Sequence, residues 1–587
     1  MTSEGGFHGL FQPAGQGPER FTVALISDQK TTEDPGPGAT TAFPGRHLAG
    51  CQHAERQSVA CVGEIYNADD LCRQLGLAPG SSLTHMLMVG WQRWSLNLLT
   101  HLNGVFSLVL RDENELLLYR DPSGLRNLYF YTGQSGQISF GTHLDALLGR
   151  PETERRLARR SLHEYLRFGD IAATHTLFEE VSAIEAGQLL RWSARCMETL
   201  TFPQADTASP ASFSDAVEMA DQLLQHSVRT RLADVDRPAA FLSGGMDSAL
   251  LCAMASKFRK DTVAITVGFD TPSYDEAGVA QQIASHLGMT HEVLRFTRQE
   301  YLSSFERLGQ STEQPIADPA ASATLLAFDH CRSRFDVVID GTGADEAVGM
   351  LPPRHVRLAV EYASLIPRSP RLMLARMLRA SPSLKGYAPV LDFEHPADTM
   401  IRWRGFTRTE IEGLCDEPVR FEHTQFYRTF HRHPRRDHFE RYSALMNAMP
   451  SDRLSQATLI SGMLARYPYC DSETDRFIRQ LRTDYRYLPG EPKRILRALL
   501  ARYLDARIWD GPKHGFNFPM REFLAGQNYL LVRQYLDAGL WRQTGVLRHD
   551  KVHSYAAQFI AGDDRLTFRV WSLVVLGAWL SNHGELH

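Results

Sequence analysis

A short apolar run that ends in two glycines, Phe241-Leu242-Ser243-Gly244-Gly245-Met246-Asp247-Ser248, constrains the fold of this chain more than any other feature. The residues before the glycines predict a buried strand, and MDSALLCAMASK after them predicts a helix. Glycines at such a turn let a ligand approach the backbone without interference from a Cβ atom. Free N–H groups at a helix start hold phosphate oxygens. The sequence therefore predicts a phosphate-binding loop, although it has no Walker-type lysine.

Predicted strands and helices alternate after this loop. TVAITVGF is typical of a strand, YDEAGVAQQIASHLG of a helix, and FDVVIDGTGADE of a strand that ends in a loop. This rhythm predicts a doubly wound parallel sheet that binds its ligand at the carboxyl ends of the strands. From about residue 351 onward a helical pattern dominates.

A second polar loop, Asp340-Gly341-Thr342-Gly343-Ala344-Asp345-Glu346, follows the apolar run Val337-Val338-Ile339. In a parallel sheet its carboxylates face the same crevice as the first loop. Carboxylate oxygens are the ligands that Mg²⁺ prefers, so Asp247 and Asp345 are predicted to share magnesium between pyrophosphate oxygens. Ser243 and Ser248 add hydroxyl donors. The alternative interpretation is a solvated acidic turn.

The N-terminal part has a different pattern. VFSLVLRD, ELLLYRD, NLYFYTG and QISFGT predict short strands between about residues 58 and 145, whereas the segments 29–46 and 202–212 predict a loop and a linker. We therefore expect an α/β chain with a strand-rich α+β domain at residues 1–203. A doubly wound nucleotide-binding domain with a helical C-terminal part is expected at residues 204–587.

Composition narrows the function. A net charge of -5 gives no reason to expect nucleic acid as a partner. The eight cysteines are too scattered for a disulfide framework, and no CxxC pair suggests zinc. The most apolar stretch, Val570 to Leu580, has about half the roughly 20 residues that span a bilayer, so it predicts a buried helix. Without a signal-peptide pattern, a cytoplasmic protein with no membrane partner is expected.

These motifs resemble the asparagine synthetase superfamily along nearly the whole chain. SGGMDS resembles its pyrophosphate loop, and GTGADE resembles its second magnesium-carrying loop. In the first half, motifs resembling the glutaminase domain are Gly63-Glu64-Ile65-Tyr66-Asn67, Leu102-Asn103-Gly104-Val105-Phe106, Arg120-Asp121-Pro122-Ser123-Gly124 and Leu177-Phe178-Glu179-Glu180-Val181. In the second half the matching motifs are Ser273-Tyr274-Asp275-Glu276, Arg466-Tyr467-Pro468 and Gly511-Pro512-Lys513-His514-Gly515-Phe516. The resemblance implies an Ntn-type glutaminase-like domain and a synthetase domain that uses ATP and Mg²⁺.

The resemblance also implies residue roles. Ser243, Gly244, Gly245 and Ser248 would hold pyrophosphate, Leu242, Val267 and Gly341 would border the adenosine beside Asp340, and Asp247 and Asp345 would hold Mg²⁺. Lys513 would lie on the acyl-adenylate side, and the predicted catalytic residues are Lys513, Asp345, Glu346 and Thr342. Lys513 would neutralise charge as the adenylate forms and collapses, which is worth about 3–4 kcal/mol for such a donor. The alternative for Lys513 is a surface lysine in a loop.

Three departures concern the glutaminase half. Glutamine-dependent members have a nucleophilic cysteine directly after Met1, where this sequence has Thr2. They have an oxyanion-hole asparagine before the glycine, where this sequence has Val62, and losing such a donor costs about 10²–10³ in rate. Ser82 stands where an aspartate grips the glutamine amine. We therefore expect a domain that does not hydrolyse glutamine and persists as a scaffold or docking surface.

Two departures concern the synthetase half. Thr342 and Leu464 stand where asparagine synthetases carry glutamates, so the pocket should be larger and less polar than one for free aspartate. Without glutamine, an amine carried by the substrate makes amide closure intramolecular, which replaces several kcal/mol of entropy. The segment Arg428 to Arg441, rich in Arg and His with Phe430 and Phe439, suggests a peptide-binding surface, although a solvated helical face explains it equally well.

The sequence thus predicts an ATP-dependent carboxylate–amine ligase, closest in character to lasso-peptide macrolactam cyclases. Its expected partner is a linear precursor peptide, with a leader peptidase and a leader-binding protein beside it. The alternatives are a β-lactam-synthetase-like cyclase, an ammonia-dependent asparagine synthetase and, from another class, a non-catalytic binding scaffold.

Overall fold

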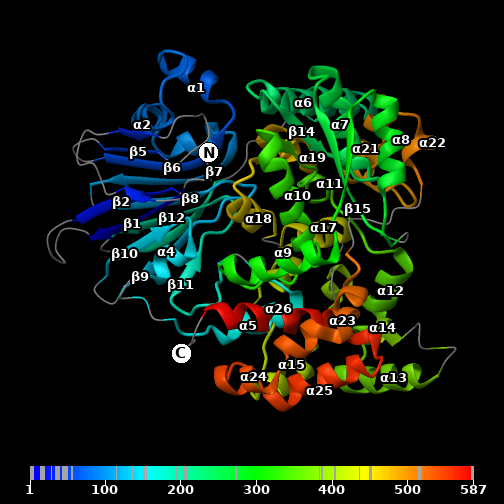
Figure 1. Cartoon of the computed structure of the whole chain (residues 1–587). Coiled ribbons are helices and arrows are strands. Elements are labelled where there is room, and N and C mark those ends of the chain that lie inside the picture. The colour runs from blue at the N-terminus through cyan, green and yellow to red at the C-terminus, as the bar shows by residue number, and fades with distance from the viewer. Residues whose placement is uncertain are drawn as a thin grey trace.

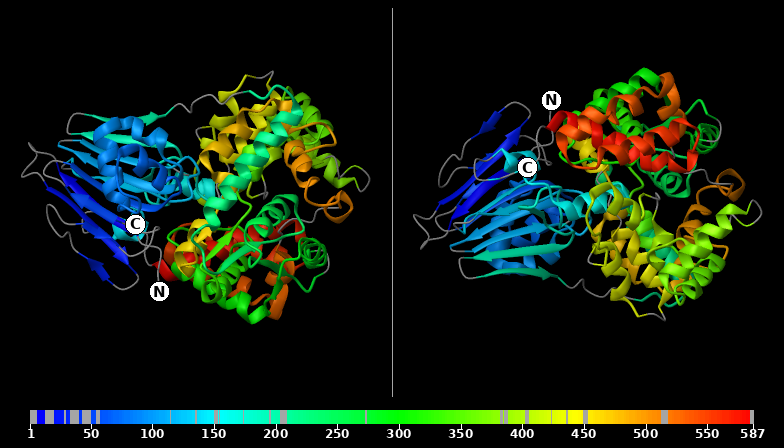
Figure 2. Two further views of the ribbon diagram at one scale, coloured as in Figure 1. Left: turned by 90° about the horizontal axis from the view of Figure 1, so that it is seen from above. Right: turned by 90° about the horizontal axis from the view of Figure 1, so that it is seen from below.

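A computed structural model describes residues 6–12, 20–27, 30–32, 40–42, 50–53 and, with gaps, 57–583. The longer gaps are 203–208, 449–452 and 512–517. Two stacked antiparallel sheets form the N-terminal part, and a parallel sheet among many helices forms the rest (Figure 1, Figure 2). Among the described residues, no helix combines the length and apolar character that crossing a membrane requires.

The N-terminal sheets have six and seven strands. The first has the order β11 (Val181–Ala183), β9 (Tyr129–Thr132), β10 (Ile138–Gly141), β1 (Gly6–Gln12), β2 (Arg20–Ser27), β3 (Lys30–Thr32). The second has the order β13 (Met197–Thr201), β12 (Gln188–Ser193), β8 (Glu115–Arg120), β7 (Gly104–Asp112), β6 (Gln57–Ile65), β5 (Gly50–His53), β4 (Thr40–Ala42). The predicted strand-rich, Ntn-like domain is confirmed.

The central strand β7 explains why this part reads as apolar runs. Phe106 and Leu108 face a cluster with α1 (Ala68–Leu75) and α2 (Leu83–Trp94), whereas Val109 faces the other sheet. Because both faces are covered, nearly the whole strand is buried and apolar.

The sheet of the second half is parallel throughout, with the order β16 (His291–Arg295), β15 (Val263–Gly268), β14 (Pro238–Phe241), β17 (Val337–Ile339), β18 (Ala465–Arg466). The chain runs outward from β14 to β16 and then returns to the opposite side of β14 as β17. The strand order therefore reverses between β14 and β17, which is where doubly wound sheets bind ligands. The predicted doubly wound sheet is confirmed.

Helices cover both faces of the parallel sheet. One face packs against α6 (Phe213–Leu232), α7 (Met246–Phe258), α8 (Ala277–Leu287) and α21 (Arg494–Leu500). The other face packs against α10 (Ala321–Arg334) and α18 (Arg453–Ser461). The largest apolar cluster among the described residues joins the C-terminal helices to strands β9 and β11 of the N-terminal part. It includes α26 (Thr567–His583), with Trp571 and Trp579 buried. The buried helix predicted at Val570 to Leu580 is confirmed.

The sequence prediction was wrong for part of the segment 29–46, which contains β3 and β4. Each is a three-residue strand at the outer edge of its sheet. Edge strands this short carry little apolar alternation, so the turn-forming residues around them dominate the pattern. The domain boundary near residue 203 falls in a segment outside the described residues and stays a prediction.

Candidate functional site

The two loops singled out in the sequence lie side by side where the strand order reverses. The loop after β14 begins with Leu242, whose N–H donates to the carbonyl of Ile265 on β15 at 2.8 Å. The loop after β17 comes close enough that a Cβ atom on Gly341 would lie 3.5 Å from the backbone nitrogen of Ser248. Val267, predicted to border adenosine, is on β15 next to this edge.

Hydrogen bonds within the first loop fix its shape. The Ser248 hydroxyl donates to the Gly245 carbonyl at 3.0 Å and accepts from the Ser243 N–H at 3.0 Å. The Ser243 hydroxyl accepts from the Gly245 N–H at 3.1 Å. A Cβ atom on Gly244 would lie 3.3 Å from Val279 on α8, so this glycine also permits close packing. Both serines thus hold the turn in the conformation that precedes α7.

The second loop is held in the same way. The Thr342 backbone N–H donates to Asp340 Oδ1 at 2.8 Å, and the Thr342 hydroxyl donates to the same oxygen. The Gly343 N–H donates to Glu346 Oε2 at 3.1 Å. Burial, with the nearby charge of Asp345 adding to it, raises the pKa of Glu346. Thr342 and Glu346, both predicted to be catalytic, therefore hold the backbone of their own loop.

Asp247 and Asp345 come together around a lysine that the sequence analysis did not identify. Lys493 Nζ lies 2.6 Å from Asp247 Oδ2 and 2.6 Å from Asp345 Oδ1. Burial alone would lower the pKa of Lys493, but the two carboxylates outweigh burial and raise it. We call Asp247, Asp345 and Lys493 the nucleotide-edge cluster. Its lysine is charged at neutral pH.

The nucleotide-edge cluster fits a magnesium ion. Asp247 Oδ1 is buried and has no hydrogen-bond partner among the described residues, while Asp345 is 36% exposed. Two carboxylates at one sheet edge, one with a free buried oxygen, form the kind of oxygen donor set that Mg²⁺ binds beside phosphate groups. Asp247 and Asp345 are thus positioned to hold the ion, and the ammonium group of Lys493 is positioned to pair with phosphate oxygens.

The sequence did not indicate a role for Lys493, because no local motif surrounds it. It lies 246 residues after Asp247, at the N-cap of α21, in a left-handed conformation with φ 56°. A lysine between a Gly-Glu-Pro turn and a helix has no signal of its own. Lys513, which the resemblance assigned to the acyl-adenylate, lies outside the described residues.

The glutaminase-type motifs lie against the synthetase half. Glu64 on β6 forms a buried ion pair with Arg466 on β18, with an Nη2–Oε1 distance of 2.7 Å. The Tyr66 hydroxyl donates to Glu64 Oε2 at 2.8 Å. Asn103 donates to Asp471 at 2.9 Å, and Asp471 pairs with Arg231 at 3.1 Å. We call Glu64, Arg466, Arg231 and Asp471 the interdomain cluster.

Of the three residues that differ from the glutaminase pattern, the structure describes Val62 and Ser82. Val62 is 4% exposed and belongs to the apolar core between the two antiparallel sheets. It lines a small pocket with Asn127 and His143 from its own half and with Glu313 and Gln456 from the other. Ser82 caps α2, because its hydroxyl accepts from the His85 N–H at 3.2 Å. Thr2 lies outside the described residues.

The suggestion of an aromatic peptide surface between Arg428 and Arg441 was wrong. Phe430, on α16 (Gln425–Arg432), and Phe439, on α17 (His438–Ala448), are buried at 3% and 5% exposure. Arg441 is also buried, with its guanidinium 3.9 Å from the centre of the Phe430 ring. The aromatic residues recur at helical spacing because they form the core side of two amphipathic helices.

The fold and the site together define an ATP-dependent, amide-forming enzyme with a glutaminase-like domain before its nucleotide-binding domain. The chain matches the asparagine synthase family over residues 219–581 and the glutamine amidotransferase domain over residues 50–202. It belongs to the asparagine synthase family.

Individual proteins similar to this chain include an asparagine synthetase and an amidase. The chain is 23% identical to glutamine-hydrolysing asparagine synthetase 1 of Bacillus subtilis over 545 residues, 88% of this chain and 84% of the relative. It is 27% identical to the amidase chry2 of Gibberella zeae over 328 residues, 51% of this chain and 48% of the relative. A solved structure of glutamine phosphoribosylpyrophosphate amidotransferase from B. subtilis is similar with 12% identity and a TM-score of 0.22, covering 50% of this chain and 75% of that one.

Proposed function

We propose that this enzyme adenylates a carboxylate of a linear peptide and closes a macrolactam with an amine of the same peptide, as a lasso-peptide cyclase does. The observation that carries the adenylation step is the nucleotide-edge cluster. In this cluster Lys493 lies 2.6 Å from both Asp247 and Asp345, at the sheet edge where doubly wound folds generally bind their ligands.

The proposed chemistry has two steps. A carboxylate oxygen of an Asp or Glu side chain attacks the α-phosphorus of ATP, so that pyrophosphate leaves and an acyl-adenylate forms. The N-terminal amine of the peptide then attacks the acyl carbon, so that AMP leaves and an amide remains. The amine must lose a proton, and its ordinary pKa near 8 lets water or a weak base accept it. Lys493 and Lys513 would neutralise phosphate charge, and Mg²⁺ held by Asp247 and Asp345 would supply further charge neutralisation.

Val62 supports an amine source other than glutamine. Its apolar side chain is packed into the sheet core and offers no hydrogen-bond donor to an oxyanion. Ser82 is engaged as a helix cap. Position 63 requires glycine for a structural reason, because at φ +112° a Cβ atom would lie 2.2 Å from the Val105 carbonyl oxygen. The Gly-Glu-Ile-Tyr-Asn motif therefore persists here for reasons of backbone packing and interdomain contact.

Thr342 supports a substrate other than free aspartate. Its hydroxyl is engaged by Asp340, and Leu464 is apolar, so neither position offers a carboxylate to an amino-acid substrate. A linear precursor peptide is the proposed partner, and a leader peptidase and leader-binding protein would prepare it. A β-lactam-type cyclisation or an ammonia-dependent asparagine synthesis would use the same cluster with a smaller substrate.

Mass spectrometry distinguishes these reactions. The full chain is incubated with ATP and Mg²⁺ and offered one of three substrates: linear peptides with a free N-terminus and an internal Asp or Glu, aspartate with ammonia, or aspartate with glutamine. Loss of one water mass from a peptide while AMP accumulates is the expected result. Asparagine from ammonia would replace the cyclase proposal by the synthetase, and asparagine from glutamine would overturn the proposal about Val62.

A matched variant separates an enzyme from a binding scaffold. Asp247→Asn keeps the size of the side chain but removes the charge that the cluster supplies. AMP formation that survives this change would show that the activity has another source. ATP binding without any AMP in the unchanged protein would favour the scaffold.

A further inference from the structure

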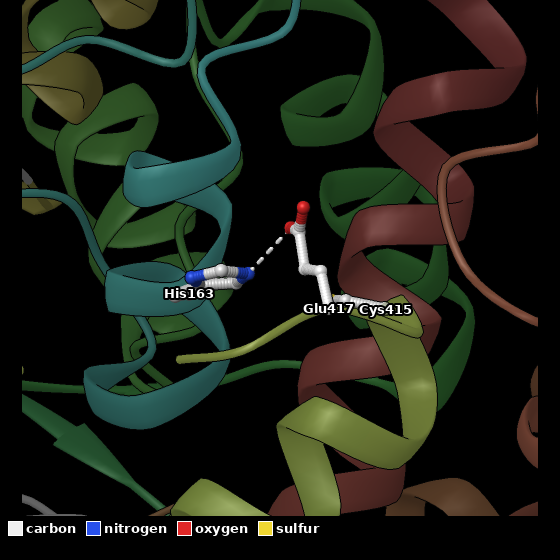
Figure 3. A group of neighbouring side chains, drawn as sticks. All are labelled: His163, Cys415 and Glu417. Atoms are coloured by element: carbon white, nitrogen blue, oxygen red, sulfur yellow. Dashed lines mark hydrogen bonds and ion pairs between the residues drawn. The ribbon is translucent and has the colours of Figure 1, made fainter. Parts of the chain in front are cut away.

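A group of three side chains of different chemical types lies outside the nucleotide site. His163 is on α5 (Arg159–Phe168), Cys415 is the last residue of α15 (Arg408–Cys415), and Glu417 follows two residues later (Figure 3). His163 Nε2 lies 2.8 Å from Glu417 Oε1. One nitrogen, the thiol sulfur and one carboxylate oxygen all lie within 4.8 Å of one another.

The backbone brings Cys415 and Glu417 to the same side. Asp416, between them, ends α15 in the left-handed conformation with φ 57° and ψ 35°. This conformation is uncommon for a residue with a side chain and turns the chain sharply at the helix end. The Asp416 side chain is 81% exposed and points to solvent, while its two neighbours face the histidine.

The charges of the three ligands balance those of a divalent cation. Burial raises the pKa of the Cys415 thiol to about 12, so the thiol is protonated without a cation and a bound cation must displace that proton. A neutral imidazole, a thiolate and a carboxylate around a divalent ion form an uncharged complex, which a half-buried position tolerates well.

We propose that His163, Cys415 and Glu417 form a zinc site that fastens the glutaminase-like half to the synthetase half. On binding, the thiol releases a proton to solvent and the sulfur bonds to zinc. His163 lies within the amidotransferase match and the other two within the asparagine synthase match. The ligands are therefore too far apart in sequence for any motif to show them.

The ligand types select zinc over magnesium. Thiolate and imidazole suit zinc, whereas Mg²⁺ requires oxygen ligands. Three protein ligands leave one position of a tetrahedron for water, and Glu417, 33% exposed, opens the cluster to solvent. Arg159 contributes an opposing positive charge, but its Nη1 donates to the Val546 carbonyl at 3.0 Å. We therefore expect an exchangeable zinc ion rather than one locked in the fold.

Zinc binding is measured on the full chain after removal of metals by a chelator and return to excess Mg²⁺. The probe is Zn²⁺ alone, titrated in competition with a chromophoric chelator, with metal content measured after desalting. We expect about one zinc ion per chain. Co²⁺ in place of zinc should give the near-ultraviolet band of a thiolate–cobalt bond, which reports the sulfur ligand directly.

Four variants test the ligands. Cys415→Ser should abolish the cobalt–thiolate band, whereas Cys196→Ser, at an exposed cysteine, should leave it unchanged. His163→Gln should weaken zinc binding by more than the roughly 10–100-fold that loss of a supporting residue costs. His175→Gln is its control, because His175 pairs with Glu164 at 3.0 Å and, within the part of the chain that the structure describes, the two belong to no group of three candidate metal ligands.

The proposal is overturned if the metal-free chain takes up no zinc, or if Cys415→Ser binds it as tightly as the unchanged protein. Should Cys415→Ser fail to fold, the nearly isosteric Glu417→Gln decides, and unchanged zinc affinity in that variant also overturns the proposal. The readout does not depend on ATP turnover, so failure of the proposed cyclase reaction leaves this test intact.

Discussion

The nucleotide-edge cluster and the interdomain cluster differ in how their charges are paired. In the interdomain cluster, both oxygens of Glu64 accept hydrogen bonds, and Glu64 and Arg466 are each 3% exposed. In the nucleotide-edge cluster, one lysine faces two carboxylates, and Asp247 Oδ1 has no hydrogen-bond partner among the described residues. The carboxylate oxygens of the first cluster all accept hydrogen bonds, whereas the second cluster has a carboxylate oxygen to spare.

The backbone joins the two clusters. The Asp340 N–H donates to the carbonyl of Arg466 at 3.0 Å where β17 pairs with β18. The ion pair between Glu64 and Arg466 thus holds the strand against which the second nucleotide loop starts. A glutaminase-type motif can therefore be retained for positioning, whether or not the domain hydrolyses glutamine.

The largest expected effect follows from breaking the buried ion pair between Glu64 and Arg466. Glu64→Ala removes the buried carboxylate that pairs with Arg466 at 2.7 Å, which should lower the free energy of unfolding by about 3–5 kcal/mol. Urea unfolding followed by circular dichroism measures it. The double variant Glu64→Ala with Arg466→Met should recover much of the loss, because it leaves no unpaired buried charge. A loss under about 1 kcal/mol in the single variant would contradict this account of the cluster.

In the nucleotide-edge cluster, a substitution should lower activity rather than stability. Asp247→Asn should reduce AMP formation by about 10²–10³, since a charge that acts on the reacting phosphates is lost. Stability should stay the same or rise, because Lys493 keeps Asp345 as its partner. Asp261→Asn, at an exposed pair with Arg259, is the matched control and should change neither quantity. A large drop in stability for Asp247→Asn would place it with the interdomain cluster.

Removing the lysine should create a metal site that works without nucleotide. Lys493→Met leaves two neighbouring carboxylates without their shared cation, and Mg²⁺ takes over that role. At a concentration several times its Kd, Mg²⁺ should stabilise this variant by about 1 kcal/mol. Thermal unfolding with and without Mg²⁺, in the absence of ATP, measures the shift. An equal response in the unchanged protein would mean that Lys493 does not compete with the ion.

A smaller effect should appear at acid pH. Burial alone would raise the pKa of Asp471, but Arg231 and Asn103 outweigh burial and lower it below the ordinary value. Such a group stabilises the fold above its unfolded pKa, and this stabilisation is lost as pH falls through the folded pKa. Asp471→Asn should therefore flatten the acid limb of a plot of unfolding free energy against pH. An acid limb as steep as before would show that other carboxylates dominate it.

The sequence predicted those parts of the site that a local pattern encodes. The loop from Ser243 to Ser248 and the loop from Asp340 to Glu346 both follow apolar strands, so their place at the sheet edge followed from the alternation of elements. Lys493 could not be found in this way, because a parallel sheet and a separate helix bring it to Asp247 across 246 residues. The same holds for Glu64 and Arg466, whose pairing depends on how the two halves of the chain pack.

The sequence predictions that were wrong concern side chains whose burial the sequence did not reveal. Between Arg428 and Arg441 the charged residues dominate the composition, but the turns of α16 and α17 direct Phe430 and Phe439 into the core. Thr342 and Glu346 have side chains that can take part in catalysis, but both form hydrogen bonds within their own loop. Residue type indicates what a side chain can do, and the available partners decide what it does.

The smallest expected effect tests whether burial or mere pairing separates the two clusters from ordinary surface charges. Arg507 donates to Asp505 through Nε at 3.0 Å, close to the 3.1 Å of Arg231 and Asp471, but it is 89% exposed. Water and salt screen such a pair, and ordering two long side chains opposes it. Arg507→Ala should therefore leave the urea midpoint unchanged within error. A measurable loss would mean that geometry alone stabilises ion pairs in this protein, and the contrast drawn from burial would fail.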